Sequence, residues 1–296
     1  MIIDKIKNST FFPIIILIFL ALIWGSSFIL IKKGLLAYSP VQVGTLRIVF
    51  ASIVLFSIAI ENLGPLFREN WKQLLILGII SNLAPAILFA IAETHMNSSL
   101  AGMLNSLTPV FTIVVGVIFY KAKINFPLAI GLALGLAGSL ILSLVGASGA
   151  LGEFNIYALY VIAATILYGF AGNLIKEFVN KFDPVVLVSL TMLMVGPIAV
   201  FILLTTDFID VTLNHPESLF SILSILVLGA VGTAYALGLF NQLVHQTSAI
   251  FASSVTYLIP IAAIGWGIID DETLFPLHFV GMAVIIIGIF LINKNK

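Results

Sequence analysis

The sequence predicts an all-α integral membrane protein of ten transmembrane helices, arranged as two inverted five-helix repeats. Three observations carry this prediction: the composition, the number of long apolar stretches and an internal repeat. Of the 296 residues, 61% are hydrophobic and only 9% are charged, and the mean hydropathy is +1.21. Soluble domains carry about 25% charged residues. A water-soluble fold of this size would therefore expose far more apolar surface than such proteins tolerate.

Ten stretches of the chain are long and apolar enough to cross a membrane, which takes about 20 residues in a helix. They cover residues 11–31, 41–60, 73–92, 97–120, 125–146, 154–175, 184–205, 217–240, 246–269 and 273–292. These continuous runs argue against an outer-membrane barrel, whose strands alternate over ~10 residues. Four prolines lie inside the stretches, and each is expected to kink its helix. They are Pro85, Pro109, Pro197 and Pro260.

The placement of positive charge predicts the orientation of the chain. With the N-terminus inside, ten of the 13 Lys and Arg residues fall in inner segments, and only Lys32 and Lys33 fall in outer ones. Positive loops face the cytoplasm, so both termini are expected there, with the chain in the cytoplasmic (inner) membrane. The first stretch follows two lysines, as a signal peptide would. Its length and a motif that recurs later in the chain indicate a retained helix instead.

Parts of the chain match later parts at nearly constant offsets. At an offset of 144 residues, Gly25 matches Gly169 and Pro40 matches Pro184. At an offset of 151 residues, Phe89 matches Phe240 and Pro109 matches Pro260. At an offset of 150 residues, Gly131 matches Gly281 and Gly138 matches Gly288. The chain is therefore predicted to hold two copies of one five-helix unit, residues 11–146 and 154–292. Because five is odd, the second copy enters the membrane from the opposite side, an arrangement typical of alternating-access carriers.

Several short motifs occur in an order that is typical of a known family. They are Trp24-Gly25-Ser26-Ser27 leading to Lys32, Pro40 followed by Arg47, and Ser99-Leu100-Ala101 running to Pro109. In this order they resemble the EamA family of the drug/metabolite transporter superfamily, over essentially the whole chain. The resemblance implies two EamA-like repeats and a bacterial inner-membrane carrier of amino acids or other small metabolites, often an exporter. The Gly-Glu pair usual after the fourth helix is here Tyr120-Lys121, and Asp271-Glu272 in the second copy.

Two ionisable side chains lie within or at the end of a predicted span, where each costs ~3 kcal/mol unless it has a partner or water. Arg47, whose repeat counterpart is Thr191, is either a cavity cation for a substrate carboxylate or phosphate or a paired or snorkelling side chain. Glu93, opposite Val244 in the second copy, pairs with Arg47 or Lys32, binds a substrate amine or carries a coupling proton. The alternative is a carboxylate in an interfacial loop.

Other polar and aromatic side chains within spans are candidate substrate contacts. They are Trp24, Asn105, Tyr168, Asn173, Tyr235, Asn241 and Tyr257. Asn105 and Tyr257 each precede a proline by four or fewer residues, where a kink exposes carbonyls to a ligand. Hydrogen bonding between helices and plain packing are the alternatives. Gly131, Gly135 and Gly138 predict close helix packing, within one chain or between two.

The sequence also limits the possible functions. The chain has no cysteine, its four histidines are scattered, and it has neither a His-Glu-x-x-His pair nor a P-loop. We therefore expect no metal site, no cofactor and no enzyme activity, and the net charge of +0 gives no indication of nucleic-acid binding. The expected function is secondary transport of a small polar or amphipathic, amino-acid-like metabolite by alternating access, as an exporter. The expected partners are that substrate, lipid and a coupled proton, and the oligomeric state stays open. The alternatives are a channel-like facilitator and a polytopic enzyme acting on lipid.

Overall fold

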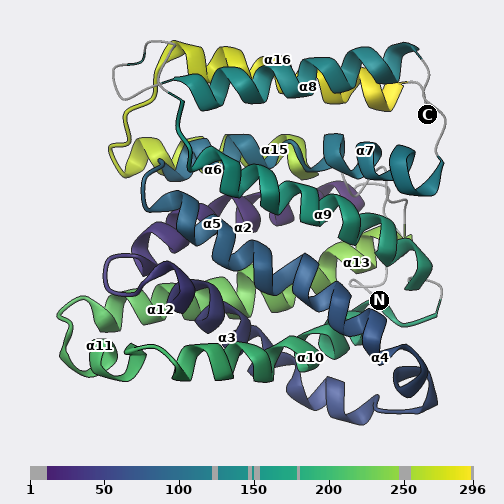
Figure 1. Ribbon diagram of the computed structural model, residues 1–296, viewed down its shortest axis with the longest axis vertical. Coiled ribbons are helices and arrows are strands. Elements are labelled where there is room, and N and C mark those ends of the chain that lie inside the picture. The colour runs from purple at the N-terminus through teal and green to yellow at the C-terminus, as the bar shows by residue number, and fades with distance from the viewer. Residues whose placement is uncertain are drawn as a thin grey trace.

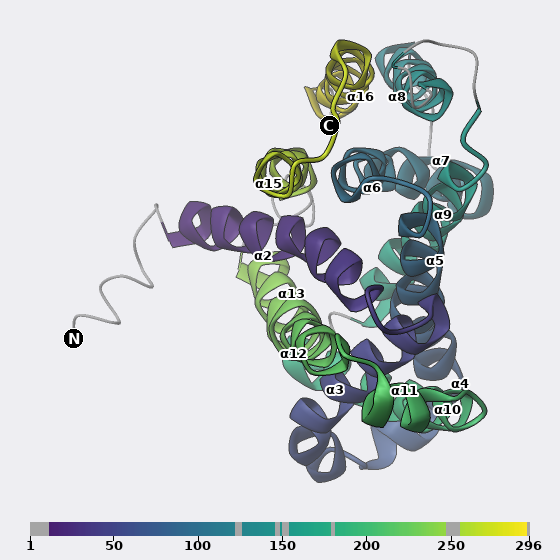
Figure 2. The same ribbon diagram turned by 90° about the vertical axis from the view of Figure 1, so that its left-hand side faces the viewer.

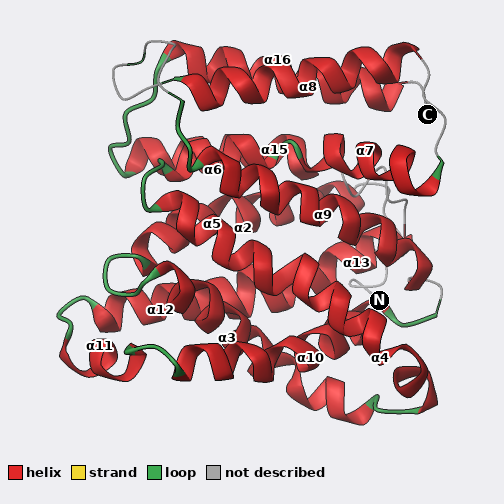
Figure 3. Ribbon diagram, in the orientation of Figure 1, coloured by secondary structure: helices red, strands yellow, loops and turns green. Residues whose placement is uncertain are grey.

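The computed structural model describes residues 12–121, 126–145, 149, 154–178, 181–246 and 255–294. These residues form helices and contain no strand (Figure 3). The helices are α2 (Phe12–Gly34), α3 (Pro40–Glu61), α4 (Pro65–Gly78), η1 (Ile79–Leu83), α5 (Ala84–Glu93), α6 (Ser98–Asn105), α7 (Thr108–Tyr120), α8 (Phe126–Leu144), α9 (Ala158–Phe178), α10 (Pro184–Leu204), α11 (Phe208–Asn214), α12 (Ser218–Gly229), η2 (Ala230–Tyr235), α13 (Ala236–Gln246), α15 (Val255–Ile269) and α16 (Pro276–Lys294).

The described helices suit a multi-pass membrane protein. Seven helical segments are long and apolar enough to span a membrane, and three shorter apolar helices accompany them. Large apolar side chains point outward around the molecule, among them Phe126, Phe201 and Ile269, which are 79%, 69% and 72% exposed. Water would penalise such a surface, whereas lipid tails would cover it.

The helix boundaries follow most of the predicted stretches within a few residues. One departure is α13, which ends at Gln246 and not at the predicted 240, and two more concern α4 and α11. Helix α4 begins at Pro65, well before the predicted start at 73, because Pro65 and the preceding Gly64 favour a helix start there. Helix α11 is too short for a spanning stretch, so the apolar pattern does not predict it. The start of the predicted ninth span, up to residue 254, lies partly outside the described residues.

Two predicted spans contain a π-helical turn. The third consists of α4, η1 and α5, and the eighth of α12, η2 and α13. The two π-turns begin at Ile79 and Ala230, which are separated by the same sequence offset as Phe89 and Phe240. Both interrupt the regular helical hydrogen bonding at the same place in their spans, and π-turns of this kind frequently occur at functional sites.

The four prolines lie in different helical contexts. Pro109 lies in the first turn of α7, after the turn at Ser106 and Leu107, where its missing N–H costs little. Pro85 lies just beyond the π-turn η1, within a continuous helical span. Pro197 and Pro260 lie inside the continuous helices α10 and α15. The kinks expected at Pro197 and Pro260 stay predictions.

Two positive-φ residues refine the alignment after the fourth and ninth spans. Lys121 has φ 54° and Asp271 has φ 55°, both in the left-handed region. They are separated by the same offset as Gly131 and Gly281, so Lys121 rather than Tyr120 occupies the position equivalent to Asp271. The first-copy equivalent of Glu272 is then residue 122, which lies outside the described residues.

Helices α8 and α16 pack against each other at one edge of the molecule, beside α6, α7 and α15 (Figures 1 and 2). A methyl group added at Gly138 would lie 2.6 Å from the carbonyl oxygen of Gly281, and one at Gly288 would lie 2.6 Å from that of Gly131. The residue numbers run in opposite senses, so the two helices are antiparallel with their backbones nearly in contact. The close packing expected of these glycines therefore occurs within one chain.

Two further close approaches join the halves of the chain in matching pairs. A methyl group at Gly78 would lie 2.8 Å from the carbonyl oxygen of Thr191, and one at Gly229 would lie 2.6 Å from that of Arg47. Gly78 and Gly229 are counterparts under the sequence repeat, and so are Arg47 and Thr191. The contact of Gly78 with Thr191 and the contact of Gly229 with Arg47 are therefore equivalent under the repeat. Each joins a glycine of one half to a backbone carbonyl of the other half.

The same reciprocity holds where α2 meets α15 and where α9 meets α7. A methyl group at Gly25 would lie 3.2 Å from the backbone nitrogen of Ala263, and one at Gly169 would lie 3.0 Å from that of Thr112. Gly25 and Gly169 are repeat counterparts, and Thr112 and Ala263 are separated by the same offset as Pro109 and Pro260. The packing partners of α2 and α9 therefore correspond under the sequence offsets.

One side of the molecule, which we name the Lys32 end, gathers the short helix α11 and ten ends of the longer described helices. Hydrogen bonds there join Asn97 to Thr273 (3.1 Å), Asn155 to His95 (3.2 Å) and Ser143 (2.9 Å), Gln42 to Asp207 (2.8 Å) and Ser221 to the carbonyl of Lys33 (2.8 Å). Helices α2, α5, α8, α10 and α15 thus end at this side, and α3, α6, α9, α12 and α16 begin at it.

Candidate functional site

Arg47 is fixed in the interior by a hydrogen bond between the two halves of the chain. It lies two turns into α3, about 10 Å from the start of the helix at 1.5 Å per residue. Its Nε donates to Thr233 Oγ1 at 2.7 Å, and the Thr233 hydroxyl donates to the carbonyl of Leu228 at 3.1 Å, within the turn that leads into η2. The side chain is partly exposed, and its terminal amino groups have no hydrogen bond to a described residue. Those groups can therefore donate to a ligand.

Gly232, the residue before Thr233 in η2, forms a hydrogen bond with Trp24. The Trp24 indole Nε1 donates to the carbonyl of Gly232 at 3.1 Å. The π-turn η2 thus supplies two adjacent residues, Gly232 and Thr233, that position side chains from α2 and α3. The sequence did not predict either contact, because a π-turn has no strong residue signature.

Two aromatic pairs lie beside these contacts. The rings of Trp24 and Phe240 have centroids 5.2 Å apart, and those of Tyr168 and Phe89 are stacked at 6.1 Å. Trp24 and Tyr168 are repeat counterparts, as are Phe89 and Phe240, so the two pairs are equivalent. Phe28 adds an edge contact to Phe89 at 5.7 Å. Such faces suit the apolar part of a ligand.

Glu93 ends helix α5 and is buried in the interior. The residue is only 7% exposed, and neither carboxylate oxygen has a hydrogen bond to a described residue. It is within electrostatic range of Lys32, Arg47 and Glu272. Neither of the pairings expected from the sequence, with Arg47 or with Lys32, forms as an ion pair within the described part of the chain. The interfacial-loop alternative is wrong, because the side chain is buried.

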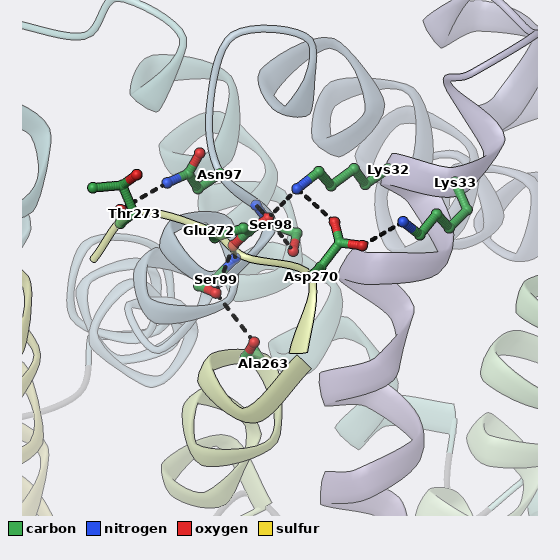
Figure 4. Close-up of polar contacts among 9 residues, drawn as sticks. All are labelled: Lys32, Lys33, Asn97, Ser98, Ser99, Ala263, Asp270, Glu272 and Thr273. Atoms are coloured by element: carbon green, nitrogen blue, oxygen red, sulfur yellow. Dashed lines mark hydrogen bonds and ion pairs between the residues drawn. The ribbon is translucent and has the colours of Figure 1, made fainter. Parts of the chain in front are cut away.

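Lys32 and Lys33 instead bind the turn between α15 and α16 (Figure 4). Lys32 Nζ lies 2.8 Å from both Asp270 Oδ2 and Glu272 Oε1, and Lys33 pairs with Asp270 Oδ1. These contacts connect the end of α2 to the last turn before the C-terminal helix. They close the Lys32 end between the two halves of the chain.

Glu272 also caps helix α6. Its carboxylate accepts hydrogen bonds from the backbone N–H of Ser98 at 2.9 Å and of Ser99 at 3.0 Å, and from their hydroxyl groups at 2.8 and 2.7 Å. An anion at a helix N-terminus satisfies unpaired N–H groups and is favoured by the helix dipole. Burial would raise the pKa of Glu272, but the hydrogen bonds from Lys32, Ser99 and Ser98 outweigh it and lower that pKa. The pKa of Asp270 is likewise lowered, by Lys32 and Lys33.

The remaining predicted contacts differ in their surroundings. Asn173 Nδ2 donates to the carbonyls of Thr112 and Gly169, and Asn241 Nδ2 donates to that of Pro184, so both amides join helices. Asn105 bonds only locally among described residues, accepting from the Thr108 hydroxyl at the break between α6 and α7.

Tyr235 is 54% exposed and points away from the packed interior. The side chain of Tyr257 lies outside the described part of the structure. The structure thus brings Trp24, Arg47 and Tyr168 together, with Glu93 in electrostatic range of Arg47. Within the described residues no group of three or more His, Asp or Glu side chains could hold a metal ion.

Comparisons with known proteins agree with the fold and with the transporter motifs. The profile of the EamA-like transporter family matches residues 11–144 and again 155–294. An uncharacterized transporter of Archaeoglobus fulgidus is 25% identical over 92% of this chain and 95% of its own. The uncharacterized inner membrane transporter YedA of Escherichia coli K12 is 24% identical over 94% and 89%.

Two further similarities concern a named substrate and a solved fold. The S-adenosylmethionine/S-adenosylhomocysteine transporter of Chlamydia trachomatis serovar L2 is 25% identical over 87% of this chain and 82% of its own. A chain of known crystal structure, 13% identical, superposes with a TM-score of 0.61 over 93% of this chain and 94% of that one. Because the family profile covers nearly the whole sequence, the protein is a membrane transporter that belongs to the EamA-like transporter family.

Proposed function

We propose that the protein exports a small zwitterionic or amphipathic, amino-acid-like metabolite across the cytoplasmic membrane by alternating access. The observation that carries this proposal is Arg47, an interior cation whose terminal amino groups have no described partner, beside aromatic rings from both halves of the chain. A guanidinium binds a carboxylate or phosphate through two parallel hydrogen bonds. The rings then contact the rest of the molecule.

Two inverted five-helix repeats, residues 11–146 and 154–292, supply the alternating movement in this proposal. The reciprocal contacts of Gly78 with Thr191 and of Gly229 with Arg47 support it. So does the antiparallel contact of Gly138 with Gly281 and of Gly131 with Gly288, which a two-fold rotation between α8 and α16 would exchange. Halves related in this way can swap conformations at little cost in free energy, which gives two states of similar stability.

Ten spans follow if the three shorter apolar helices also cross the membrane. The alternation of helix ends at the Lys32 end supports this count, since, apart from the short α11, five described helices end there and five begin there. Positive charge in the predicted inner segments favours a cytoplasmic location for the opposite end and for both termini. The Lys32 end then faces outward.

The site lies where the repeats meet. The outward end is closed by the ion pairs of Lys32 and Lys33, and every ion pair among the described residues lies at that end. Transport requires these contacts to break when the outer side opens and the substrate leaves. Trp24, Arg47 and Tyr168 form the proposed binding surface, and Asn105, Asn173, Tyr235, Asn241 and Tyr257 remain candidate contacts in other conformations.

The name of one relative suggests further molecules for the proposed substrate class. The Chlamydia protein is named for S-adenosylmethionine and S-adenosylhomocysteine, and both molecules carry an amino-acid group and an aromatic base. An arginine for the carboxylate and aromatic faces for the apolar part would suit molecules of this type. We therefore include them with free amino acids in the proposed substrate class.

A binding screen with matched arginine variants tests the proposal. Ligand binding raises the apparent stability of the purified protein, so amino acids, nucleosides, S-adenosylmethionine and cationic drugs are compared by thermal shift. The chain has only two arginines, Arg47 in the interior and Arg68 exposed on α4. Arg47→Gln is expected to remove the shift caused by a hit, and Arg68→Gln is expected to keep it. A hit that is equally strong in both variants would contradict the proposed site.

A further inference from the structure

Glu93 is an ionisable side chain at the proposed site whose two carboxylate oxygens accept no hydrogen bond from a described residue. The residue is only 7% exposed. A charged carboxylate in such surroundings is strongly unfavourable unless a cation or a proton is bound to it. Lys32 and Arg47 lie within electrostatic range, but no described residue forms an ion pair with Glu93, so a positive partner in direct contact is still needed.

The charged and titratable neighbours come from four elements around α5. Lys32 on α2 is already bound to Asp270 and Glu272, and Arg47 on α3 is bound through Nε to Thr233. Tyr168 on α9 and Glu272 in the turn after α15 are the other groups in the neighbourhood, and α6 carries no titratable residue. Glu272 repels an ionised Glu93, which adds to the need for a cation.

The surroundings also select the kind of cation. A divalent metal ion prefers six or more oxygen ligands or several carboxylates, and no such cluster occurs in the described residues. Phe89 lies one turn before Glu93 on the same face of α5, in contact with Phe28 and Tyr168. Aromatic faces beside a carboxylate attract organic cations such as ammonium or sulfonium groups.

We propose that Glu93 is an exchange site, at which a proton and the onium group of the transported molecule bind in turn. This rests on the proposed function, because the onium group belongs to the molecule whose carboxylate binds Arg47. In the absence of substrate, the carboxylate takes a proton from water and forms an O–H bond. When the onium group binds, that proton returns to water and an ion pair replaces it, and no bond of the substrate changes. Export of one cationic group is thereby linked to the opposite movement of one proton.

The first test measures the proton directly, without any knowledge of the substrate. The full-length protein is placed in lipid nanodiscs at neutral pH, and the infrared band of a protonated buried carboxyl group is recorded. We expect this band in the wild type, its loss in Glu93→Gln and its retention at a shifted position in Glu93→Asp. Glu69→Gln, which changes an exposed carboxylate on α4, is the matched control and should keep the band. A band that persists in folded Glu93→Gln overturns the proposal.

The second test uses tetramethylammonium chloride as the onium probe and sodium chloride at equal concentration as the ionic control. Tetramethylammonium is expected to reduce the carboxyl band by at least half, whereas sodium leaves it unchanged. Equal effects of the two salts overturn the exchange. The result can be told apart from that of the arginine variants. If tetramethylammonium leaves the carboxyl band unchanged while Arg47→Gln still removes ligand binding, only the role of Glu93 is contradicted. If tetramethylammonium reduces the band but Arg47→Gln does not change ligand binding, only the proposed substrate site is contradicted.

Discussion

The two halves of the chain share their packing but not their charges. Both contain a π-turn at the same place, an aromatic pair and a glycine against a backbone carbonyl of the other half. In contrast, Arg47 corresponds to Thr191 in the second half, and Glu93 corresponds to Val244. The shared features are those that helix packing requires, and the unshared features are those that would recognise a charged molecule.

This difference separates the framework from the specificity of the site. A symmetric framework explains how two conformations have similar free energies, and it needs no particular charge. A cation and an anion present in only one half make the proposed site asymmetric, so a molecule with opposite charges at its two ends would bind there in one orientation. Substitutions at equivalent positions should therefore have equal effects in the framework and unequal effects in the site.

The largest expected difference is between Arg47→Gln and Thr191→Val. Removing a charged hydrogen-bond donor costs about 1.5–3 kcal/mol, which corresponds to a loss of affinity of roughly 10-fold to 150-fold. Thr191→Val removes only a hydroxyl group that donates within its own helix, so affinity should change by less than about threefold. Titration calorimetry with the best ligand from the screen measures both. Similar losses in the two variants would show that the site is symmetric after all.

The framework makes the opposite prediction for Gly78→Ala and Gly229→Ala. In each variant the added methyl group meets a backbone carbonyl of the other half at 2.8 or 2.6 Å. Overpacking of this kind costs about 1–3 kcal/mol, and both variants should lower the thermal transition to a similar extent. Gly265→Ala is the control, because a methyl group there has open space. A large effect at one glycine alone would argue against equivalent packing.

A smaller effect is expected from Thr233→Val, which removes the hydroxyl that holds Arg47 Nε. The arginine keeps its charge but loses its fixed orientation, so ligand affinity should fall by about fivefold, or ~1 kcal/mol. The thermal stability of the protein without ligand should change less than in the glycine variants. An unchanged affinity would show that Thr233 does not position Arg47 for the ligand.

The smallest effect concerns pH at the Lys32 end. The pKa values of Asp270 and Glu272 are lowered, so their ion pairs with Lys32 and Lys33 are complete above the usual pKa range and are lost only as the pH falls through the lowered values. Between pH 8 and pH 5.5 the closure should therefore stay constant. Distances between spin labels at Leu36 and Thr273, both exposed, measure it. If the label distance increases between pH 8 and pH 5.5, the pH dependence of opening at the Lys32 end would come from these ion pairs and not from Glu93.

Long apolar helices can be predicted from the sequence because they depend on apolar length, and seven segments of the described structure are long and apolar enough to span a membrane. The two inverted repeats are a prediction from residue identity at fixed offsets. The sequence also identified Arg47 and Glu93, since a charge inside an apolar run is conspicuous. It could not show the partners of either residue. Thr233, which holds Arg47, and Glu272, which caps α6, both come from the other half of the chain, and the orientation of Thr233 depends on a π-turn.

Two sets of candidate residues have partners that the sequence does not specify. Lys32 was an expected partner of Glu93, but the turn after α15 brings two carboxylates to it instead. Asn173 and Asn241 were selected as polar residues in apolar spans, and the structure uses their amide N–H groups to join helices. Phe89 and Phe240 aligned in the repeat, yet their ring contacts follow only from the packing of α2 on α13 and of α5 on α9.

The central claim is that the two ends of the molecule open alternately around one site. The chain has no cysteine, so two labels can be introduced without removing any native cysteine. Labels at Leu36 and Thr273 report on the Lys32 end, and labels at Glu61 and Lys181 report on the opposite end. The account predicts that ligand shifts the two distance distributions in opposite directions. If both ends widen together, or if neither changes while ligand is bound, alternating access is contradicted.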